Sequence, residues 1–330
     1  MSFSFTRREL LKASAAGVAI AGVGYPLFNW LFKKKEPVFT AAVGGYDRDM
    51  LGALLDGFRE LGVTPEEIRD KRVLLKPNLV EPHRGAGQIN TDPLFLRACI
   101  EAFLTLGAAS VAIGEGPGHR RDTYYCLETT GVGDILHEDK IAFADLNFGK
   151  FHKVKNQANM STLGDLYLPE AVLDVDLVVS VAKMKTHHWA GVTLSLKNMF
   201  GIMPGSVYGW PKNVLHHAGI EKSILDINAS LTPAFALVDG IVGMEGDGPI
   251  MGTPVNSGLV VMGRNPLAVD ATCARLMGID PRKVTYLIGA SGWLGSISER
   301  MIEQRGELIA THQRNFKLID KIVAHRNIRL

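Results

Sequence analysis

Short runs of apolar residues that do not alternate with polar ones constrain the fold of this chain most. Six such runs, expected to be strands, lie at residues 38–43, 72–75, 110–113, 177–181, 234–238 and 259–262. Segments expected to be helices separate them, at residues 48–61, 92–106, 124–136 and 266–277. We expect Thr91 to be the N-cap of the second of these helices. Strands without alternation are buried on both faces, so the pattern predicts an α/β fold, with a largely parallel sheet covered by helices on both faces. Residues 119–170 are less regular and are expected to form an insertion or a small lobe.

The first 36 residues have the pattern of an export signal, followed by a single domain expected at residues 37–330. Arg7, Arg8 and Lys12 precede an uncharged stretch at residues 13–32, an order typical of a twin-arginine signal peptide. The 20 residues of this stretch are enough to cross a bilayer as an uncleaved N-terminal membrane anchor, and an A-x-A cleavage site at residues 19–21 is the alternative. We expect the twin-arginine translocase to export the protein to the periplasm, where it is either free or anchored in the inner membrane.

The charge of the chain is concentrated in that same segment. The formal net charge is +2, but residues 1–36 hold six basic and two acidic residues, so the remainder carries −2. A domain with this balance has no general attraction for nucleic acid or anionic lipid. Its three cysteines, Cys99, Cys126 and Cys273, form no C-x-x-C motif, so they predict no iron–sulfur cluster and no structural zinc.

Polar, glycine-bearing segments follow four of the expected strands. Ligands of open parallel sheets bind beyond the carboxyl ends of the strands, so we expect these segments to meet along one edge. The most informative segment is residues 177–201, because a lysine embedded among apolar residues must reach water or pair with an anion. The candidate site residues are Lys76, Asn78, Glu115, Lys183, Lys185, Thr186, His187, Lys197, Asn198, Asp239, Glu245 and Asp247.

This mixture of lysines and carboxylates suits more than one chemistry. The lysines could hold a phosphate or carboxylate group while Glu115, Glu245 and Asp247 bind a divalent metal ion. Alternatively, a lysine and a carboxylate could act as acid and base beside an enolisable carbon. In a third interpretation the residues pair with one another and only hold loops together. His216 and His217 could supply a ligand or a base, but they rank below His187.

Taken jointly, five segments resemble the uncharacterised family named for domain of unknown function 362. They are KPN at 76–78, GEGPG at 114–118, KMKTHHWAGVTLSLKNMFG at 183–201, VDGIVGMEGDGP at 238–249 and NPLAVDATCARLMGIDP at 265–281. The resemblance implies little about activity, because the chemistry of the family is not established. Many relatives carry an added ferredoxin-like domain with cysteine clusters, which this chain lacks. The resemblance favours the strand-end residues as the site. It implies that Asp270 either holds site residues in position without lying in the site itself, or is a charge at a helix N-terminus.

We therefore expect an exported enzyme that acts on an anionic small molecule. His187, Lys185 and Glu115 are the expected catalytic residues. The expected ligand-binding residues are Lys76, Asn78, Lys183, Thr186, Lys197 and Asn198. Glu245, Asp247 and Glu115 are the expected ligands of a divalent metal. The alternative is a non-catalytic binding or accessory protein that serves an iron–sulfur or other redox partner.

Overall fold

The fold is described from a computed structural model that covers residues 35–118 and 122–330. The export signal expected in residues 1–36 lies outside this range apart from Lys35 and Glu36. In the described part of the chain, no helix is both long enough and apolar enough to span a bilayer.

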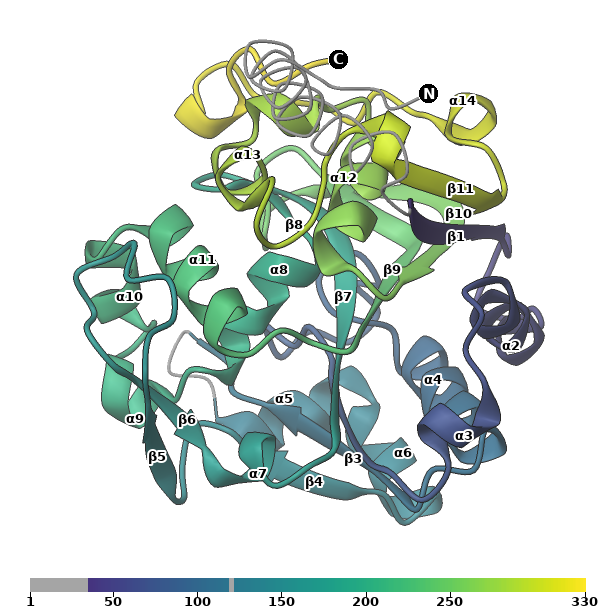
Figure 1. Ribbon diagram of the computed structural model, residues 1–330, viewed down its shortest axis with the longest axis vertical. Coiled ribbons are helices and arrows are strands. Elements are labelled where there is room, and N and C mark those ends of the chain that lie inside the picture. The colour runs from purple at the N-terminus through teal and green to yellow at the C-terminus, as the bar shows by residue number, and fades with distance from the viewer. Residues whose placement is uncertain (1–34, 119–121) are drawn as a thin grey trace, which may run out of the picture. The chain divides into compact units, whose positions relative to one another are not determined.

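Within the described residues, nine strands of the unit Glu36–Leu330 form one sheet in the order β11-β1-β10-β9-β7-β2-β3-β4, with β8 paired to β7 (Figure 1). The strands are β1 (Glu36–Ala42), β2 (Arg72–Lys76), β3 (Ser110–Glu115), β4 (Ala142–Asp145), β7 (Leu177–His187), β8 (Gly191–Thr193), β9 (Phe235–Glu245), β10 (Thr253–Gly263) and β11 (Ile302–Gly306). From β9 through β7, β2 and β3 to β4, every neighbouring pair is parallel. Only β10, beside β9 and β1, and the short β8 are antiparallel to their neighbours. The expected α/β fold with a largely parallel sheet is confirmed.

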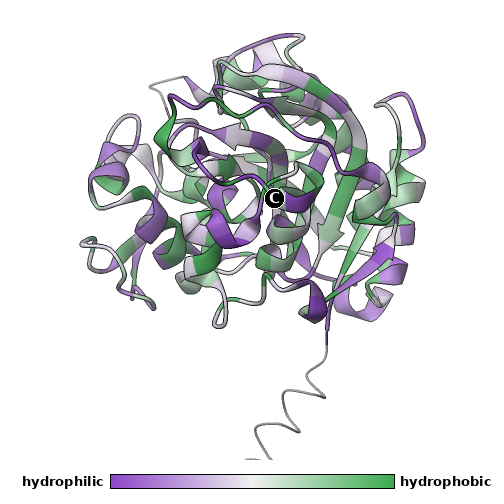
Figure 2. Ribbon diagram, turned by 90° about the horizontal axis from the view of Figure 1, so that it is seen from above, coloured by the Kyte–Doolittle hydropathy of each residue, from purple (hydrophilic) through white to green (hydrophobic). Residues whose placement is uncertain are grey.

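Helices cover both faces of this sheet. One face packs against α2 (Met50–Glu60), α4 (Pro93–Thr105) and α6 (Val132–Glu138), and the other against α8 (Ser195–Asn198), α11 (Ile220–Ser230), α12 (Pro266–Leu276) and α13 (Thr285–Ala290). Leu74 and Leu75 are neighbours on β2, yet they belong to different hydrophobic clusters, one on each face. Both faces of the sheet are therefore buried under apolar side chains, which explains why the strands are continuous apolar runs. In Figure 2 hydrophobic residues gather along the central strands and hydrophilic residues lie mainly on outer helices and loops.

The segment expected to be an insertion divides into two parts. Strand β4 joins the main sheet beside β3, after α5 (Thr123–Thr130) and α6, so this part is an ordinary layer of the fold. Gly131 separates the two helices with a φ of 81°, a left-handed conformation that favours glycine. Only β5 (Phe151–Val154) and β6 (Leu166–Pro169) form a separate, two-stranded sheet. The other helices and helical turns are α3 (Pro65–Ile68), α7 (Glu170–Leu173), η1 (Met199–Ile202), α9 (Gly205–Tyr208), α10 (Asn213–His217), η2 (Pro281–Lys283), η3 (Glu299–Met301), α14 (Ile309–His312) and η4 (Val323–His325).

Two details differ from the prediction. Strands β7 and β9 continue to His187 and Glu245, so the polar residues expected in loops lie on the strands themselves. The N-cap of α4 is Asp92, whose carboxylate accepts from the Leu94 backbone N–H, and not Thr91. The Thr91 hydroxyl is used elsewhere, because it accepts from the Asn78 N–H and donates to the Val181 carbonyl.

Candidate functional site

A cavity of about 660 Å³ lies at the carboxyl ends of β2, β3 and β7, where the polar segments were expected to meet. This volume is within the range of small-molecule sites. The predicted residues that line it are Lys76, Asn78, Glu115, Lys185, His187, Lys197, Asn198 and Asp247. Four other predicted residues, Lys183, Thr186, Asp239 and Glu245, lie outside its lining.

Lys76 and Glu115 form a buried ion pair at the ends of β2 and β3. The Lys76 Nζ donates to a Glu115 oxygen at 2.6 Å and to the Pro77 carbonyl at 2.6 Å. The Glu115 carboxylate also accepts from the backbone N–H groups of Leu79, at 3.0 Å, and Gly116, at 2.8 Å. Burial lowers the pKa of Lys76, and the attraction of Glu115 opposes that shift. With both oxygens occupied, Glu115 is placed to anchor Lys76 and two turns, rather than to exchange protons or bind a metal as expected.

Asn198 joins this pair to the helix α8. Its side-chain oxygen accepts from the Lys76 Nζ at 3.2 Å and from the Asn78 amide at 3.1 Å. Its amide nitrogen donates to the Lys76 carbonyl at 2.9 Å and to the Ser180 hydroxyl at 3.0 Å. One side chain therefore connects β2, β7 and α8, and it fixes the floor of the cavity.

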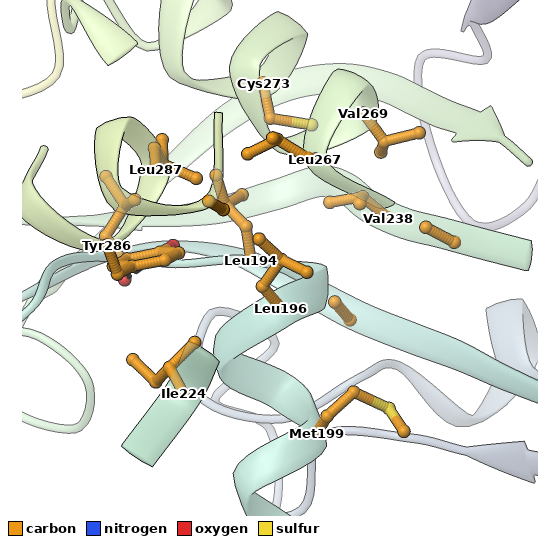
Figure 3. Close-up of a cluster of buried hydrophobic side chains, with 14 of the residues drawn as sticks. Leu194, Leu196, Met199, Ile224, Val238, Leu267, Val269, Cys273, Tyr286 and Leu287 are labelled. Carbon is orange, nitrogen blue, oxygen red and sulfur yellow. Dashed lines mark hydrogen bonds between the residues drawn. The ribbon is translucent and has the colours of Figure 1, made fainter. Parts of the chain in front are cut away.

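The position of α8 depends on Asp270, which lies on α12 and does not line the cavity. The Asp270 carboxylate accepts from the backbone N–H groups of Ser195, at 2.7 Å, and Leu196, at 2.9 Å. Burial raises the pKa of Asp270 to about 7, against the effect of these two donors. Leu194 and Leu196 pack among side chains of α11, α12 and α13 (Figure 3). Asp270 thus supports the segment that carries Lys197 and Asn198.

Two further cavity lysines are held by backbone carbonyl groups. The Lys185 Nζ donates to the carbonyls of Ile89, at 2.8 Å, and Pro249, at 3.3 Å. The side chain is fully buried, and burial together with nearby lysines holds its pKa well below the ordinary value. No carboxylate of the described residues forms a salt bridge with Lys185. In this part of the chain, carbonyl oxygens are therefore its direct partners, and Glu115 acts on its charge only from a distance.

Lys212 belongs to the site, although the sequence analysis did not select it. Its Nζ donates to the carbonyls of Gly116, at 2.7 Å, and Gly201, at 2.8 Å. Burial lowers the pKa of Lys212 to about 7. A Cβ atom on Gly201 would come within 2.5 Å of the Lys76 Nζ and a Glu115 oxygen, so the chain can approach this closely only with glycine. The sequence does carry a signal for it: Lys212 follows Trp210 and Pro211, and only Asn213 separates it from the apolar pair at 214–215, so it also lies among apolar residues.

Lys197 differs from the other cavity lysines, because it is partly exposed. Its Nζ lies 4.0 Å from the centre of the Phe200 ring. Within residues 35–118 and 122–330 it has no hydrogen-bond acceptor and no salt-bridge partner. Burial, with a smaller contribution from the charge of Lys76, lowers the pKa of Lys197 to about 7.

The hydrogen bonds of His187 oppose the acid–base role expected for it. Its Nδ1 accepts from the backbone N–H groups of Trp189, at 3.0 Å, and Ala190, at 3.2 Å. The proton of the neutral ring therefore belongs on Nε2. A second proton on Nδ1 would face two N–H donors, and burial also holds the pKa of His187 well below its ordinary value. His187 is thus suited to donate a hydrogen bond from Nε2, not to accept a proton.

Aromatic rings border the cavity beyond His187. His187 and His188 have ring centres 5.0 Å apart, and the ring of Trp189 lies 4.9 Å from His188 and 5.0 Å from His216. His216 in turn lies 5.2 Å from Phe200. Trp189 is 55% exposed. These rings, steeply inclined to one another, form a partly exposed border beside the lysines.

The four predicted residues outside the cavity have structural partners, which corrects the place in the site expected for them. Lys183 is fully buried and donates to Asp239 and to the Tyr46 hydroxyl, each at 2.7 Å. The Thr186 hydroxyl donates to the Gly246 carbonyl at 2.8 Å. A carboxylate oxygen of Glu245 accepts from the Lys317 N–H at 2.7 Å. For these residues, the interpretation that polar groups pair with one another describes the structure.

The expected metal ligands do not come together. Asp247 lies at the cavity border, 52% exposed, with an oxygen 3.6 Å from His188 Nδ1. Glu115 is enclosed by its own donors, and Glu245 lies outside the cavity. Among the described residues, no group of three His, Cys, Asp or Glu side chains is arranged to hold a metal ion. Cys99, Cys126 and Cys273 are buried free thiols.

Comparison with known proteins identifies one family. The model of the family described as Domain of unknown function (DUF362) matches residues 73–275, more than half of the chain. Thylakoid-associated protein sll1697 from Synechocystis sp. is 26% identical over 220 residues, which are 64% of this chain and 65% of that relative. The match thus spans a little less than two thirds of the relative's length.

Two solved structures are also similar. The lactate racemase apoprotein from Thermoanaerobacterium thermosaccharolyticum matches with a TM-score of 0.47 and 14% identity, over 74% of this chain and 57% of that chain. A Thermotoga maritima protein matches with a TM-score of 0.36 and 12% identity, over 65% of this chain and 54% of that chain. Structural similarity at these TM-scores and sequence identities supports no statement about the activity of this chain.

Proposed function

This chain belongs to the DUF362 family, and from that premise we propose that it is an enzyme whose cavity binds a small molecule carrying a carboxylate or phosphate group. One observation carries the proposal. The cavity is lined by four lysines, Lys76, Lys185, Lys197 and Lys212, but by a single buried carboxylate, Glu115, which pairs with Lys76. The other three lysines therefore have no salt bridge to a carboxylate among residues 35–118 and 122–330.

The energetic cost of this arrangement supports a ligand. A buried charge without a counter-charge is costly and shifts its pKa towards the neutral form, as the lowered pKa values of Lys185, Lys197 and Lys212 show. An anion in the cavity would restore the favourable interaction of all three. The hydrogen-bond count agrees, because an ammonium group has three N–H donors. Lys185 and Lys212 each donate two of these N–H groups to carbonyl oxygens. One N–H group of each charged lysine is then left for a ligand.

Binding without turnover is the second candidate function. It is favoured by the hydrogen bonds of Glu115 and His187, since both residues expected as acid and base are occupied by backbone donors. Turnover of a bound ligand would support the enzyme. Stoichiometric binding with no product would support the accessory protein.

Thermal unfolding of the full chain tests anion binding. A ligand present at a hundredfold excess over its dissociation constant stabilises the native state by about 2.7 kcal/mol, so phosphates and carboxylates of metabolite size should raise the unfolding midpoint. The rise should shrink in Lys197→Met. It should persist in Lys222→Met, which changes an exposed lysine on α11. If no phosphate or carboxylate shifts the midpoint, the proposal is wrong.

We also propose export by the twin-arginine route, which rests on Arg7, Arg8 and the uncharged stretch that follows them. The double substitution Arg7→Lys/Arg8→Lys should retain the protein in the cytoplasmic fraction of the producing cell. An unchanged periplasmic or membrane fraction would contradict this route. Membrane association after alkaline washing would separate an uncleaved anchor from a cleaved signal.

A further inference from the structure

We propose that Lys197 is a nucleophile that forms an imine with an aldehyde or ketone group of the ligand. The inference rests on the proposed anion site and narrows its ligand class to small carbonyl compounds that also carry a carboxylate or phosphate group. It is carried by a difference between Lys197 and the other lysines of the cavity.

Three of the four cavity lysines are held by the protein. Lys76 is paired with Glu115 at 2.6 Å and bonded to Asn198, while Lys185 and Lys212 each donate to two carbonyls. All three are at most 2% exposed. Lys197 is partly exposed, and none of the described residues accepts a hydrogen bond from it. Of the four amines, Lys197 is therefore the one that can move to a ligand atom without breaking hydrogen bonds to the described residues.

The surroundings of Lys197 favour the uncharged amine that such a reaction needs. A lysine becomes nucleophilic when it is desolvated or lies beside another cation. Burial desolvates the Nζ and the positive charge of Lys76 acts on it, and these effects outweigh the contact with the Phe200 ring at 4.0 Å, which favours the charged amine. The pKa of about 7 that results leaves a large neutral fraction near neutral pH. Lys185 and Lys212 would meanwhile attract the anionic group of the same ligand.

The step is balanced without an oxidant or a reductant. The nitrogen lone pair of Lys197 adds to the carbonyl carbon, and the carbonyl oxygen takes up a proton as the C–N bond forms. The nitrogen then passes one of its two protons to the hydroxyl group, which leaves as water while the C=N bond forms, so the imine keeps the other proton and is positively charged. A protonated imine withdraws electrons from the adjacent carbon, so the site would acidify a C–H bond next to the former carbonyl. This agrees with the enolisable carbon considered from the sequence.

Reductive trapping tests the assignment. The full chain would be incubated with glyoxylate, or with pyridoxal 5′-phosphate, in the presence of sodium cyanoborohydride, and the adduct located by peptide mass mapping. We expect a saturable reaction that modifies Lys197 first, that is lost in Lys197→Met and Lys197→Arg, and that is retained in Lys222→Met. Modification of exposed lysines at the same rate in wild type and Lys197→Met, with none on Lys197, would overturn the inference.

The Lys197→Arg variant separates this inference from the proposed anion site. Arginine keeps the positive charge but cannot form the imine, so anions should still raise the unfolding midpoint of this variant while the adduct disappears. Anion-induced stabilisation of the wild type with no adduct on Lys197 would overturn the inference and leave the anion site standing. If neither stabilisation nor adduct is found, both proposals are wrong. The unfolding midpoint without ligand shows whether each variant is folded.

Discussion

Lysines close together in this sequence are compensated in different ways. Lys183 and Lys185 are separated by one residue, yet Lys183 meets Asp239 in a closed ion pair and Lys185 meets only carbonyl oxygens. The partners lie far away in the chain: Asp239 is 56 residues from Lys183, and Ile89 is 96 residues from Lys185. The residue type predicted that each lysine needs compensation. The residue type did not predict whether a carboxylate or carbonyl oxygens would compensate a given lysine.

For the Lys76–Glu115 pair, the prediction is a large loss of stability when only one partner is changed. Glu115→Gln leaves a buried ammonium group without its counter-charge, which costs about 3–5 kcal/mol. The double variant Lys76→Met/Glu115→Gln should recover part of that loss, because the unpaired charge is gone. Urea denaturation measures both values.

The matched control for this pair is Glu101→Gln, which changes an exposed residue on α4. It should unfold like the wild type. If Glu115→Gln were as stable as the wild type and only inactive, the catalytic role first expected for Glu115 would be correct and its anchoring role wrong.

Among the elements, the short helix α8 contributes most to the site, because it carries Lys197 and Asn198. A helix of four residues has little stability of its own. Its first N–H groups are satisfied by Asp270 from another helix, and Leu194 and Leu196 pack into the core. The element therefore exists because its surroundings hold it in place.

Removal of the Asp270 carboxylate should loosen α8. Asp270→Ala leaves two buried N–H groups without acceptors, at about 1–3 kcal/mol each, so we expect a loss of roughly 2–6 kcal/mol in urea denaturation. Anion binding should weaken as well, since Lys197 loses its fixed position. The exposed Asp320→Ala should change neither quantity. A variant with wild-type stability would show that Asp270 does not hold the helix.

The raised pKa of Asp270 predicts that the free energy of unfolding depends on pH. The pKa of Asp270 is raised from 3.8 to about 7 in the folded protein, so between these values the folded state binds a proton that the unfolded chain releases. Its contribution to stability is present below about pH 4 and is lost as the pH rises to about 7. The stability deficit of Asp270→Ala should therefore shrink over this range. A deficit that does not change with pH would contradict the raised pKa.

For the molecule as a whole, the buried lysines predict the opposite slope at higher pH. The pKa values of Lys197 and Lys212 fall from 10.5 to about 7 on folding, so between pH 7 and 10 the unfolded chain binds protons that the folded protein releases. Stability should rise with pH there, by up to about 1.4 kcal/mol per pH unit for each lysine.

A bound anion should flatten this slope, because it favours the charged form of both lysines. The slope should be smaller in the double variant Lys197→Met/Lys212→Met, which keeps the buried Lys185, and it should be unchanged in Lys222→Met. Denaturation in urea between pH 7 and 10 measures the effect. A slope that is unchanged in the double variant would assign it to other groups.

The sequence determined the class of fold and the edge of the sheet where polar residues gather. Continuous apolar runs require burial on both faces, and this physical requirement does not depend on which strands become neighbours. The strand-end rule then located eight of the cavity residues, because every parallel strand delivers its carboxyl end to the same edge. The same local patterns identified β1, β2 and β3 to within two residues at each end.

Only the tertiary structure decided which polar residues remain available to a ligand. Lys183 pairs with Asp239, Glu115 is enclosed by three donors, and Lys197 is left without an acceptor among the described residues, while Lys212 comes from a segment that follows no strand. The reason is that the charge of a buried group is set by atoms within a few ångströms of it, and those atoms belong to residues tens of positions away in the chain. A local pattern can show that a lysine will be buried, but the partner that satisfies it, or the absence of one, is decided when the strands and helices pack.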